Sequence, residues 1–387
     1  MPSLPRIEEY ADELTAIRRD LHEHPEIGFE ETRTAEIVAE KLRAWGIEVH
    51  TGIGKTGVVG VLEGKGGGGR AVGLRADMDA LPMDEETNLP WRSKSAGKFH
   101  GCGHDGHTTM LLGAARYLSE TRDFSGKAVF IFQPAEEGLG GARAMLADRL
   151  FDRFPCDEVY GMHNNPLATP NKVGVKPGPA MAGSTFFDIH VKGVGSHGAM
   201  PHHSKDPIVA ITSLVQTLQS IVSRNVPAVK PAVLSVTQIH SGSAYNVVPD
   251  KAVICGTIRY FDDEVRDLIH KRIEEMCEGY SKLFGIEVTA DLRPIFTVLM
   301  NDADLSEAYL DAASDIVGAD NITTENELVM GSEDFADMLK AVPGAYCTIG
   351  HGGDVPVHNP AFVFDDAILP VGASVMARIV EKRLPLS

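Results

Sequence analysis

Residues 71–79 read Ala-Val-Gly-Leu-Arg-Ala-Asp-Met-Asp, a mostly apolar run followed by two aspartates. The run 71–76 predicts a strand, because short apolar runs bounded by polar residues are typical of buried strands. Asp77 and Asp79 follow the carboxyl end of that strand. Open α/β sheets bind their ligands at this edge, so the segment predicts both a sheet and the side of it that carries chemistry.

Strands and helices alternate along the chain on both sides of this segment. Apolar residues recur at helical spacing from Ile7 to Ala44 and are interrupted at His24-Pro25, because proline disfavours helix in the residue before it. Further strands are expected at 58–62, 128–132, 158–162 and 345–349, and helices at 108–118, from 304, at 334–340 and at 366–382. This alternation indicates an α/β domain built on a mostly parallel sheet.

A different pattern begins near Ser184. The expected order is a strand at 185–191, a helix at 207–224, strands at 232–239 and 252–260, a helix at 263–284 and a strand at 286–291. This is the split βαβ order of a ferredoxin-like α+β module. We therefore expect a discontinuous catalytic domain, residues 1–183 and 297–387, with a mixed sheet and helices on both faces. Residues 184–296 are expected to form a lid inserted into it.

Side chains of the metal-binding type follow two more of the expected strands. Glu136 and Glu137 come after the strand at 128–132, and His163 comes after the strand at 158–162. Neighbouring side chains on extended backbone point in different directions, so one glutamate can bind a metal while the other faces a substrate. A carboxylate beside a metal site is a natural general base, which takes a proton from attacking water and returns it to a leaving nitrogen. The alternative for this pair is a solvated acidic turn.

The segment His100-Gly-Cys-Gly-His-Asp-Gly-His107 adds a thiol and imidazoles. Cys102 and His104 are two residues apart, so both can face one side of an extended stretch. Such ligands suit zinc, cobalt or manganese and are poor ligands for magnesium or calcium alone. The alternative is a glycine-rich turn, in which Asp105 caps the helix that follows.

Eight motifs in order, spread over nearly the whole chain, resemble those of the hippurate hydrolase and auxin-conjugate amidohydrolase branch of the aminoacylase-related metallopeptidases. They are LRADMDALP (74–82), HGCGHDGH (100–107), QPAEEG (133–138), GMHN (161–164), GSHGAMPH (195–202), GTIR (256–259), GSEDF (331–335) and VHNP (357–360). The aminoacylase and carboxypeptidase branches carry His-x-Asp at the first strand end, where this chain has Asp77-Met-Asp79. In the branch that this chain resembles, Cys102 and His104 make up the number of ligands. Asp77 and Asp79 are therefore expected to orient the metal ligands.

The resemblance implies a dinuclear site with two divalent metal ions per subunit, of manganese, zinc, cobalt or nickel. The metal ligands that it implies are Cys102 as the bridge, His104, Glu137, His163 and His358. It also implies that Glu136 is the general base. The inserted domain would close over the substrate and form a homodimer or higher homo-oligomer.

Three residues of the expected lid complete the implied site. His197 and Asn246 would polarise the scissile carbonyl, either within one chain or across a dimer interface. Arg259 would pair with the free carboxylate of the amino-acid half of the substrate. The alternatives are a plain loop histidine at 197 and a structural ion pair at 259.

The activity implied is metal-dependent hydrolysis of the amide bond of N-acyl amino acids, such as N-acetyl, N-benzoyl or indoleacetyl amino acids. A dipeptidase or carboxypeptidase of the same family is the first alternative. A catalytically silent metal-binding protein is the second, and it would be expected to have lost the base or a ligand, neither of which is lost here.

The composition of the chain excludes some classes of partner and indicates a cellular compartment. A formal net charge of −18 argues against nucleic acid and anionic membrane surfaces, because both are bound through Lys and Arg. No run approaches the roughly 20 apolar residues that span a bilayer, and no secretory apolar region is evident. The five cysteines are odd in number and scattered, which is a poor disulfide framework. We expect a cytoplasmic protein that acts on a small molecule.

Overall fold

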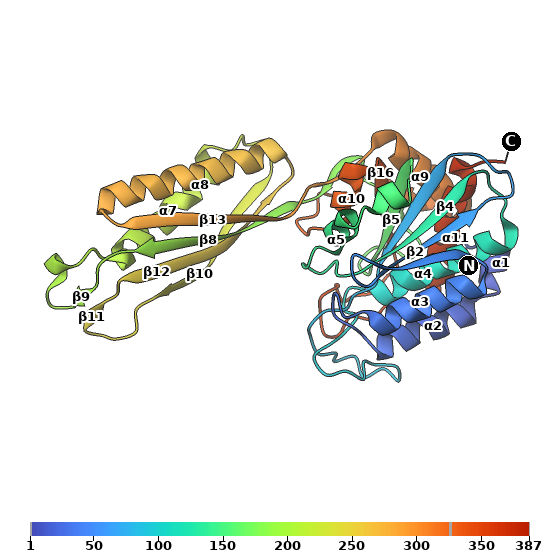
Figure 1. The fold of residues 1–387 in the computed structure, drawn as a ribbon, viewed down its shortest axis with the longest axis horizontal. Coiled ribbons are helices and arrows are strands. Elements are labelled where there is room, and N and C mark those ends of the chain that lie inside the picture. Colours follow the sequence, from blue (N-terminus) through green and yellow to red (C-terminus); the bar gives the residue numbers. More distant parts are fainter. Residues whose placement is uncertain (1, 325–326, 387) are drawn as a thin grey trace. The chain divides into compact units, whose positions relative to one another are not determined.

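The computed structural model describes residues 2–324 and 327–386, which form two compact units (Figure 1). The large unit comprises Met1–Gly178, Met300–Glu327 and Asp334–Ser387, and the small unit comprises Pro179–Leu299 and Leu328–Glu333. The small unit therefore begins and ends a few residues outside the expected lid of 184–296. It also takes in Leu328–Glu333, which we had expected in the catalytic domain.

The large unit is built on a mixed sheet in the order β1-β2-β4-β3-β5-β16-β6-β15. Its strands are β1 (Glu48–Ile53), β2 (Gly57–Glu63), β3 (Ala71–Asp77), β4 (Lys127–Gln133), β5 (Glu158–Asn165), β6 (Val173–Gly174), β15 (Ile322–Thr323) and β16 (Gly344–Gly350). The central strands β4, β3, β5 and β16 run parallel, whereas β1 and β2 are antiparallel additions at one edge. The carboxyl ends of the parallel strands therefore meet at one edge of the sheet.

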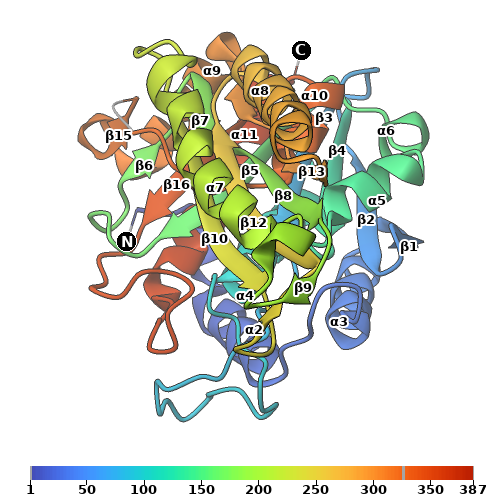
Figure 2. The same ribbon diagram turned by 90° about the vertical axis from the view of Figure 1, so that its left-hand side faces the viewer.

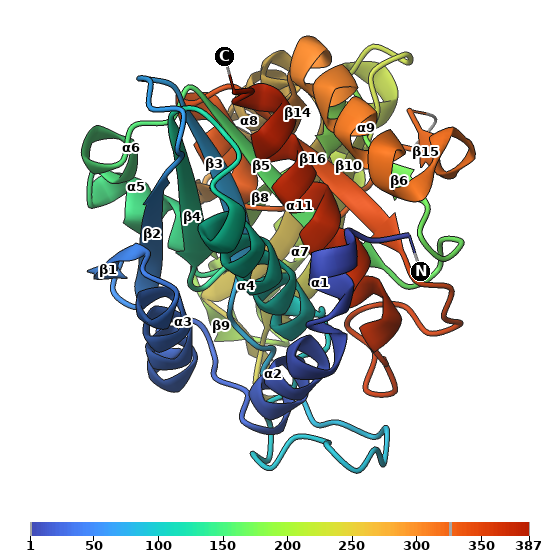
Figure 3. The same cartoon turned by 90° about the vertical axis from the view of Figure 1, so that its right-hand side faces the viewer.

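Helices cover both faces of this sheet. They are α1 (Pro5–Glu8), α2 (Ala11–Glu23), α3 (Thr32–Ala44), α4 (His104–Thr121), α5 (Gly141–Ala147), α6 (Leu150–Arg153), α9 (Ala303–Val317), α10 (Phe335–Ala341) and α11 (Leu369–Arg383), with short 3-10 turns at Ala319–Asn321 and Asp366–Ile368. Figure 3 shows α4 and α11 lying across one face. Alternate strand residues such as Leu74 and Phe130 form the core with these helices. On the opposite face, Arg75 lies 5.5 Å from the ring of Phe335 in α10.

The small unit is an antiparallel sheet in the order β10-β12-β8-β13 with two long helices (Figure 2). Its elements are β8 (Gly183–Lys192), β9 (Ser196–His197), a 3-10 turn (Pro201–His203), α7 (Pro207–Arg224), β10 (Ala232–Ser241), β11 (Val247–Val248), β12 (Lys251–Tyr260), α8 (Asp263–Phe284) and β13 (Glu287–Phe296). Asp206 and Asp262 begin the two helices by accepting hydrogen bonds from backbone amides of the first turn. The strand order is that of a ferredoxin-like module, as expected.

The chain passes between the units in two short strands, β7 (Gly178–Met181) and β14 (Leu299–Asn301), and again at both ends of Leu328–Glu333. Among the helices of residues 2–324 and 327–386, none combines the length and the apolar character that crossing a bilayer requires.

Candidate metal centre

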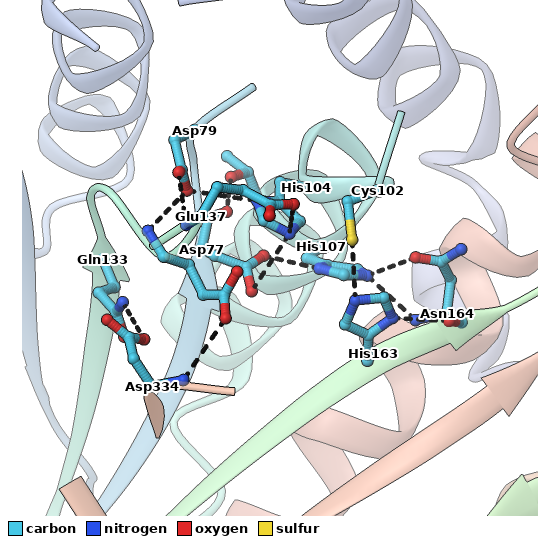
Figure 4. Close-up of polar contacts among 12 residues, drawn as sticks. Asp77, Asp79, Cys102, His104, His107, Gln133, Glu137, His163, Asn164 and Asp334 are labelled. Atoms are coloured by element: carbon cyan, nitrogen blue, oxygen red, sulfur yellow. Dashed lines mark hydrogen bonds and ion pairs between the residues drawn. The ribbon is translucent and has the colours of Figure 1, made fainter. Parts of the chain in front are cut away.

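Four segments of the large unit meet at the carboxyl ends of its central strands (Figure 4). Strand β3 ends at Asp77, with Asp79 two residues later, and β4 leads into Glu136-Glu137. Strand β5 carries His163 near its end, and the segment with Cys102 leads into helix α4. These candidate metal-binding side chains lie close together because the carboxyl ends of parallel strands share one edge of the sheet.

The expected ligands form two overlapping groups. Cys102, His104 and His163 place ligand atoms within 4.8 Å of one another, and so do Cys102, Glu137 and His358. The Cys102 sulfur lies 3.3 Å from His163 Nε2, and His358 Nε2 lies 3.2 Å from Glu137 Oε1. Cys102 belongs to both groups, so a thiolate at this position could serve two cations at once.

Two buried polar atoms of this cluster fit a bound cation. His104 Nε2 and Glu137 Oε1 are buried and make no hydrogen bond among the described residues, although Glu137 Oε1 lies within ion-pair distance of His358 Nε2. His104 Nε2 and Glu137 Oε1 lie 3.9 Å from each other, too far for a hydrogen bond. A thiol, three imidazoles and a carboxylate are a donor set for zinc, manganese or similar ions. The residues present therefore fit a pair of divalent metal ions.

In His104 and His163, contacts made by Nδ1 leave the other ring nitrogen, Nε2, directed at the cluster. His104 Nδ1 lies 3.3 Å from Asp79 Oδ1, and His163 Nδ1 donates to the carbonyl of Asn164 at 2.6 Å. Burial and the nearby charge of His107 hold the pKa of His163 well below its usual range. A neutral His163 keeps its Nε2 lone pair available, as a metal ligand requires.

Hydrogen bonds hold the carboxylate of Asp77 in place next to the expected ligands. It accepts from His107 Nδ1 at 2.6 Å and from Arg75 at 2.7 Å. Burial opposes its charge, but His104, Arg75 and His107 outweigh that effect and hold the pKa of Asp77 well below its usual range. Asp77 is therefore a fixed negative charge behind the histidines, in keeping with an orienting role.

Glu136 lies beside the ligand groups and is 6% exposed. Its carboxylate shares a potential metal-binding group with His104 and Glu137, all within 4.8 Å. The amide of Asp334, at the start of α10, lies 3.4 Å from Glu136 Oε1. A carboxylate in this position has restricted access to water and lies beside the expected metal ligands, as the expected role of general base requires.

A buried polar cluster lies under Glu136 around Asp334, and the part that Arg75 and Gln133 play in it was missed from the sequence. Asp334 accepts hydrogen bonds from Gln133 at 2.7 Å and from the amide of Ala142 at 2.9 Å, and Arg75 donates to Gln133 at 2.8 Å. One signal was available: Arg75 is a charge inside an otherwise apolar strand, and such a charge needs a buried partner.

The alternative role considered for Asp105 is wrong. Helix α4 begins at His104 instead of Thr108, so Asp105 lies inside its first turn, and the residue before the helix is Gly103, with no side-chain cap. Asp105 is buried and lies 2.7 Å from His22 Nδ1 and 3.3 Å from Arg18. Its carboxylate therefore anchors helix α2 to helix α4 through ion pairs.

The three expected lid residues all lie in the small unit, at its two ends. His197 in β9 and Asn246 next to β11 are exposed, joined by the hydrogen bond from the amide of Gly198 to the carbonyl of Asn246 at 2.7 Å, and they line a cavity of about 740 Å³. Arg259 lies at the far end of β12, where it donates to Ser184 at 2.5 Å. No carboxylate among the described residues pairs with Arg259, so the alternative of a structural ion pair finds no partner there.

The separation of these residues follows from the sheet register. Strand β12 starts at Lys251, beside the β9–β11 pair, and reaches Arg259 near its other end. At the usual rise of a strand, Lys251 and Arg259 are about 26 Å apart, and His197 lines the same cavity as Lys251 at the near end of the strand. One copy of the small unit cannot bring both side chains to the same small substrate.

Comparisons with known proteins agree on one family. The sequence profile of Peptidase family M20/M25/M40 matches residues 73–382. The chain is 43% identical to a hippurate hydrolase of Campylobacter jejuni over 99% of this chain and 100% of that one. It is 39% identical to an N-acetyl-L-cysteine deacetylase of Bacillus subtilis over 96% of this chain and 88% of that one. The crystal structure of a dinuclear metal-binding M20 peptidase from Bacillus subtilis superposes with a TM-score of 0.86 at 33% identity, covering 98% of this chain and 100% of that one.

Proposed function

The chain belongs to peptidase family M20/M25/M40 and is a metal-dependent hydrolase of N-acyl amino acids, and we propose how its residues carry out that reaction. The reaction splits the amide bond and releases a carboxylic acid and a free amino acid. The observation that carries the proposal is the pair of ligand groups that share Cys102, with Glu136 beside them.

The five ligands would hold two divalent metal ions, of manganese, zinc, cobalt or nickel. These residues are Cys102, His104, Glu137, His163 and His358. When bound, such ions polarise a carbonyl oxygen and acidify water. Burial and the charge of Glu137 raise the pKa of the Cys102 thiol, so metal binding at Cys102 has to displace a proton.

Glu136 moves the proton in this mechanism. Its carboxylate accepts a proton from the attacking water and then delivers that proton to the nitrogen of the leaving amino acid. Without the second transfer the amide nitrogen would have to leave as an anion. The 6% exposure of Glu136 keeps bulk water from competing for the proton.

Arg259 would bind the carboxylate that every N-acyl amino acid carries. Its guanidinium donates only to neutral groups of Ser184, Thr257 and Ile258 among the described residues, so its charge is available for an anion. A planar guanidinium can hold a carboxylate through two parallel hydrogen bonds. This charge would favour substrates with a free α-carboxylate over simple amides.

His197 and Asn246 would polarise the scissile carbonyl from a second copy of the chain. Both residues line the cavity beside Lys251, about 26 Å along β12 from Arg259, which argues against a joint action on one small substrate within one copy. In a homodimer formed through the small unit, one subunit would contribute Arg259 to a site, and the partner subunit would contribute the residues at the other end of its own small unit. In this proposal the small unit is both the lid and the dimerisation domain.

None of the five cysteines is paired in a disulfide, and four of them, including the buried Cys277 and Cys347, also lie outside the proposed metal ligands. Free thiols persist where the medium is reducing. We propose a cytoplasmic location, with which unpaired cysteines are in keeping.

The substrate class is tested by amine release from a panel of N-acetyl, N-benzoyl and indoleacetyl amino acids and simple dipeptides. The protein is assayed after chelation and after reloading with manganese or zinc. Release should be confined to the N-acyl compounds and should require metal. Release mainly from dipeptides would assign a dipeptidase or carboxypeptidase instead, and silence on the whole panel would favour a metal-binding protein without activity.

The role of the base is tested with a matched pair of variants. Glu136→Gln should lower kcat by about 10²- to 10⁴-fold while the bound metal stays at the wild-type level. Glu137→Gln, at the adjacent position, should lose metal and activity together, because Glu137 belongs to the ligand groups. A Glu136→Gln enzyme with wild-type kcat would contradict the assignment.

A further inference from the structure

A short N-terminal segment contacts both of the turns that carry the active-site carboxylates. This segment, residues 26–31, lies in the connection between α2 and α3 and is here called the strap. The amide of Ala80, next to Asp79, donates to the carbonyl of Glu26 at 2.8 Å. A side chain at Gly28 would place its Cβ 2.9 Å from Cα of Ala135, so the strap touches the backbone next to Glu136 directly.

Glu31 is the last residue of the strap and is completely buried. Its Oε1 accepts a hydrogen bond from the amide of Ala135 at 2.8 Å, and its Oε2 accepts from the hydroxyl of Thr56 at 2.6 Å. A buried carboxylate is costly and persists where its oxygens are satisfied. Here one of the two bonds is to the turn that holds the base.

Three successive amides of that turn are held by two buried carboxylates. Glu31 accepts from Ala135, while Asp79 accepts from Glu136 through Oδ1 and from Glu137 through Oδ2, both at 3.0 Å. Ala135 has a φ of 52°, in the left-handed region that an alanine rarely adopts. Such a conformation lasts only where the surroundings over-determine it.

We propose that Glu31 is a positioning residue for Glu136, which it orients by holding the Ala135 amide in the left-handed turn. The inference rests on the proposed function, in which Glu136 is the base. Among the described residues, the Glu31 carboxylate makes its hydrogen bonds to Ala135 and Thr56, neither of which is an expected metal ligand. It acts through the backbone that sets the direction of the Glu136 side chain.

The electrostatics of Glu31 indicate which replacement preserves the turn. Burial, with a contribution from Asp79, raises the pKa of Glu31 to about 7. A neutral side chain with one carbonyl oxygen can still accept from Ala135, so glutamine is a close substitute. Aspartate is shorter by one methylene group and withdraws the carboxylate, and leucine offers no acceptor.

The test compares Glu31→Gln, Glu31→Asp and Glu31→Leu with the wild-type enzyme under metal-loaded conditions. Glu31→Leu and Glu31→Asp should lower kcat by about 10- to 100-fold, because small displacements of a catalytic group are costly. KM and the bound metal should stay within about twofold. Glu31→Gln should stay within about threefold of the wild-type kcat. Should the leucine variant fail to fold, the aspartate variant carries the test alone.

Glu158 provides the matched control, since it is also a buried glutamate of the large unit. It lies at the opposite edge of the sheet, at the start of β5, and is held by Arg70 at 2.9 Å and by Tyr160 at 2.8 Å. Glu158→Leu should lower the melting temperature without changing kcat. Wild-type kcat in Glu31→Leu or Glu31→Asp would overturn the proposal, as would a fall in kcat explained by lost metal. The proposed function fails separately, through Glu136→Gln with wild-type kcat.

Discussion

Replacing Asp79 by asparagine should lower both the stability of the protein and its affinity for metal. Asp79 is 1% exposed, and both of its oxygens are occupied. Oδ1 accepts from the amide of Glu136 at 3.0 Å and lies 3.3 Å from His104 Nδ1, while Oδ2 accepts from the amide of Glu137 at 3.0 Å. Asparagine keeps the shape but turns one of the two acceptors into a donor. At least one buried N–H then faces an N–H, whichever way the amide is oriented.

The contacts of Asp79 allow the losses of stability and of metal affinity to be estimated. One unsatisfied buried donor costs about 1–3 kcal/mol of unfolding free energy. Metal ligands whose orienting partner is removed lose about 10- to 100-fold in metal affinity. We therefore expect Asp79→Asn to unfold at lower urea concentration as the metal-free protein and to bind zinc or manganese about 10- to 100-fold more weakly.

The assays are urea unfolding of the chelated protein and competition for metal against a chromogenic chelator. Asp157→Asn is the control, because Asp157 accepts from the amide of Ala71 at 2.7 Å, at the other end of β3. That variant should change stability only. Wild-type metal affinity and wild-type stability in Asp79→Asn would refute the claim that Asp79 holds the ligand-bearing turn.

Three further predictions concern other parts of the molecule. Burial lowers the pKa of His22, but the charge of Asp105 and hydrogen bonds to Asp105 and Glu85 outweigh it and raise the pKa to about 9. Because the folded pKa lies above the unfolded value of about 6.5, His22 stabilises the protein fully below that pH and less as pH rises through 9. The unfolding free energy should fall over this range in the wild type and less in His22→Gln, and equal slopes would contradict the assignment. Arg259→Met should raise KM for N-acyl amino acids about 10- to 100-fold with a smaller change in kcat; an unchanged KM would remove Arg259 from the site. Mixing inactive His197→Ala with inactive Glu136→Gln, after exchange of subunits, should restore activity that neither has alone, and no recovery in verified mixed dimers would place His197 outside the partner's site.

Much of the fold was predictable because its signals are local. The strands with strong apolar runs, such as β3 and β5, and the long amphipathic helices α7 and α8 lie where the sequence places them. β1 was missed, since its sequence Glu-Val-His-Thr-Gly-Ile is polar and largely exposed at the edge of the sheet. The two-residue strands β6 and β15 are too short for any periodicity to show.

Part of the candidate metal centre was predictable for a topological reason, and the residues that support it were not. Residues that follow parallel strands must meet at one edge, so Asp77, Glu137 and His163 could be grouped from their positions alone. Glu31 reads as one of several acids before a helix, and nothing local shows that it reaches Ala135, more than a hundred residues later. Such contacts depend on how separate segments pack, which no single window of sequence records.

The most direct test of the two-metal hydrolase is a titration of chelated protein with manganese or zinc, followed by amine release from N-benzoylglycine. We expect no release without metal and a rise to full activity as two equivalents per chain are bound. Full activity in the metal-free protein, or a plateau at one equivalent with the second never bound, would contradict a two-metal hydrolase.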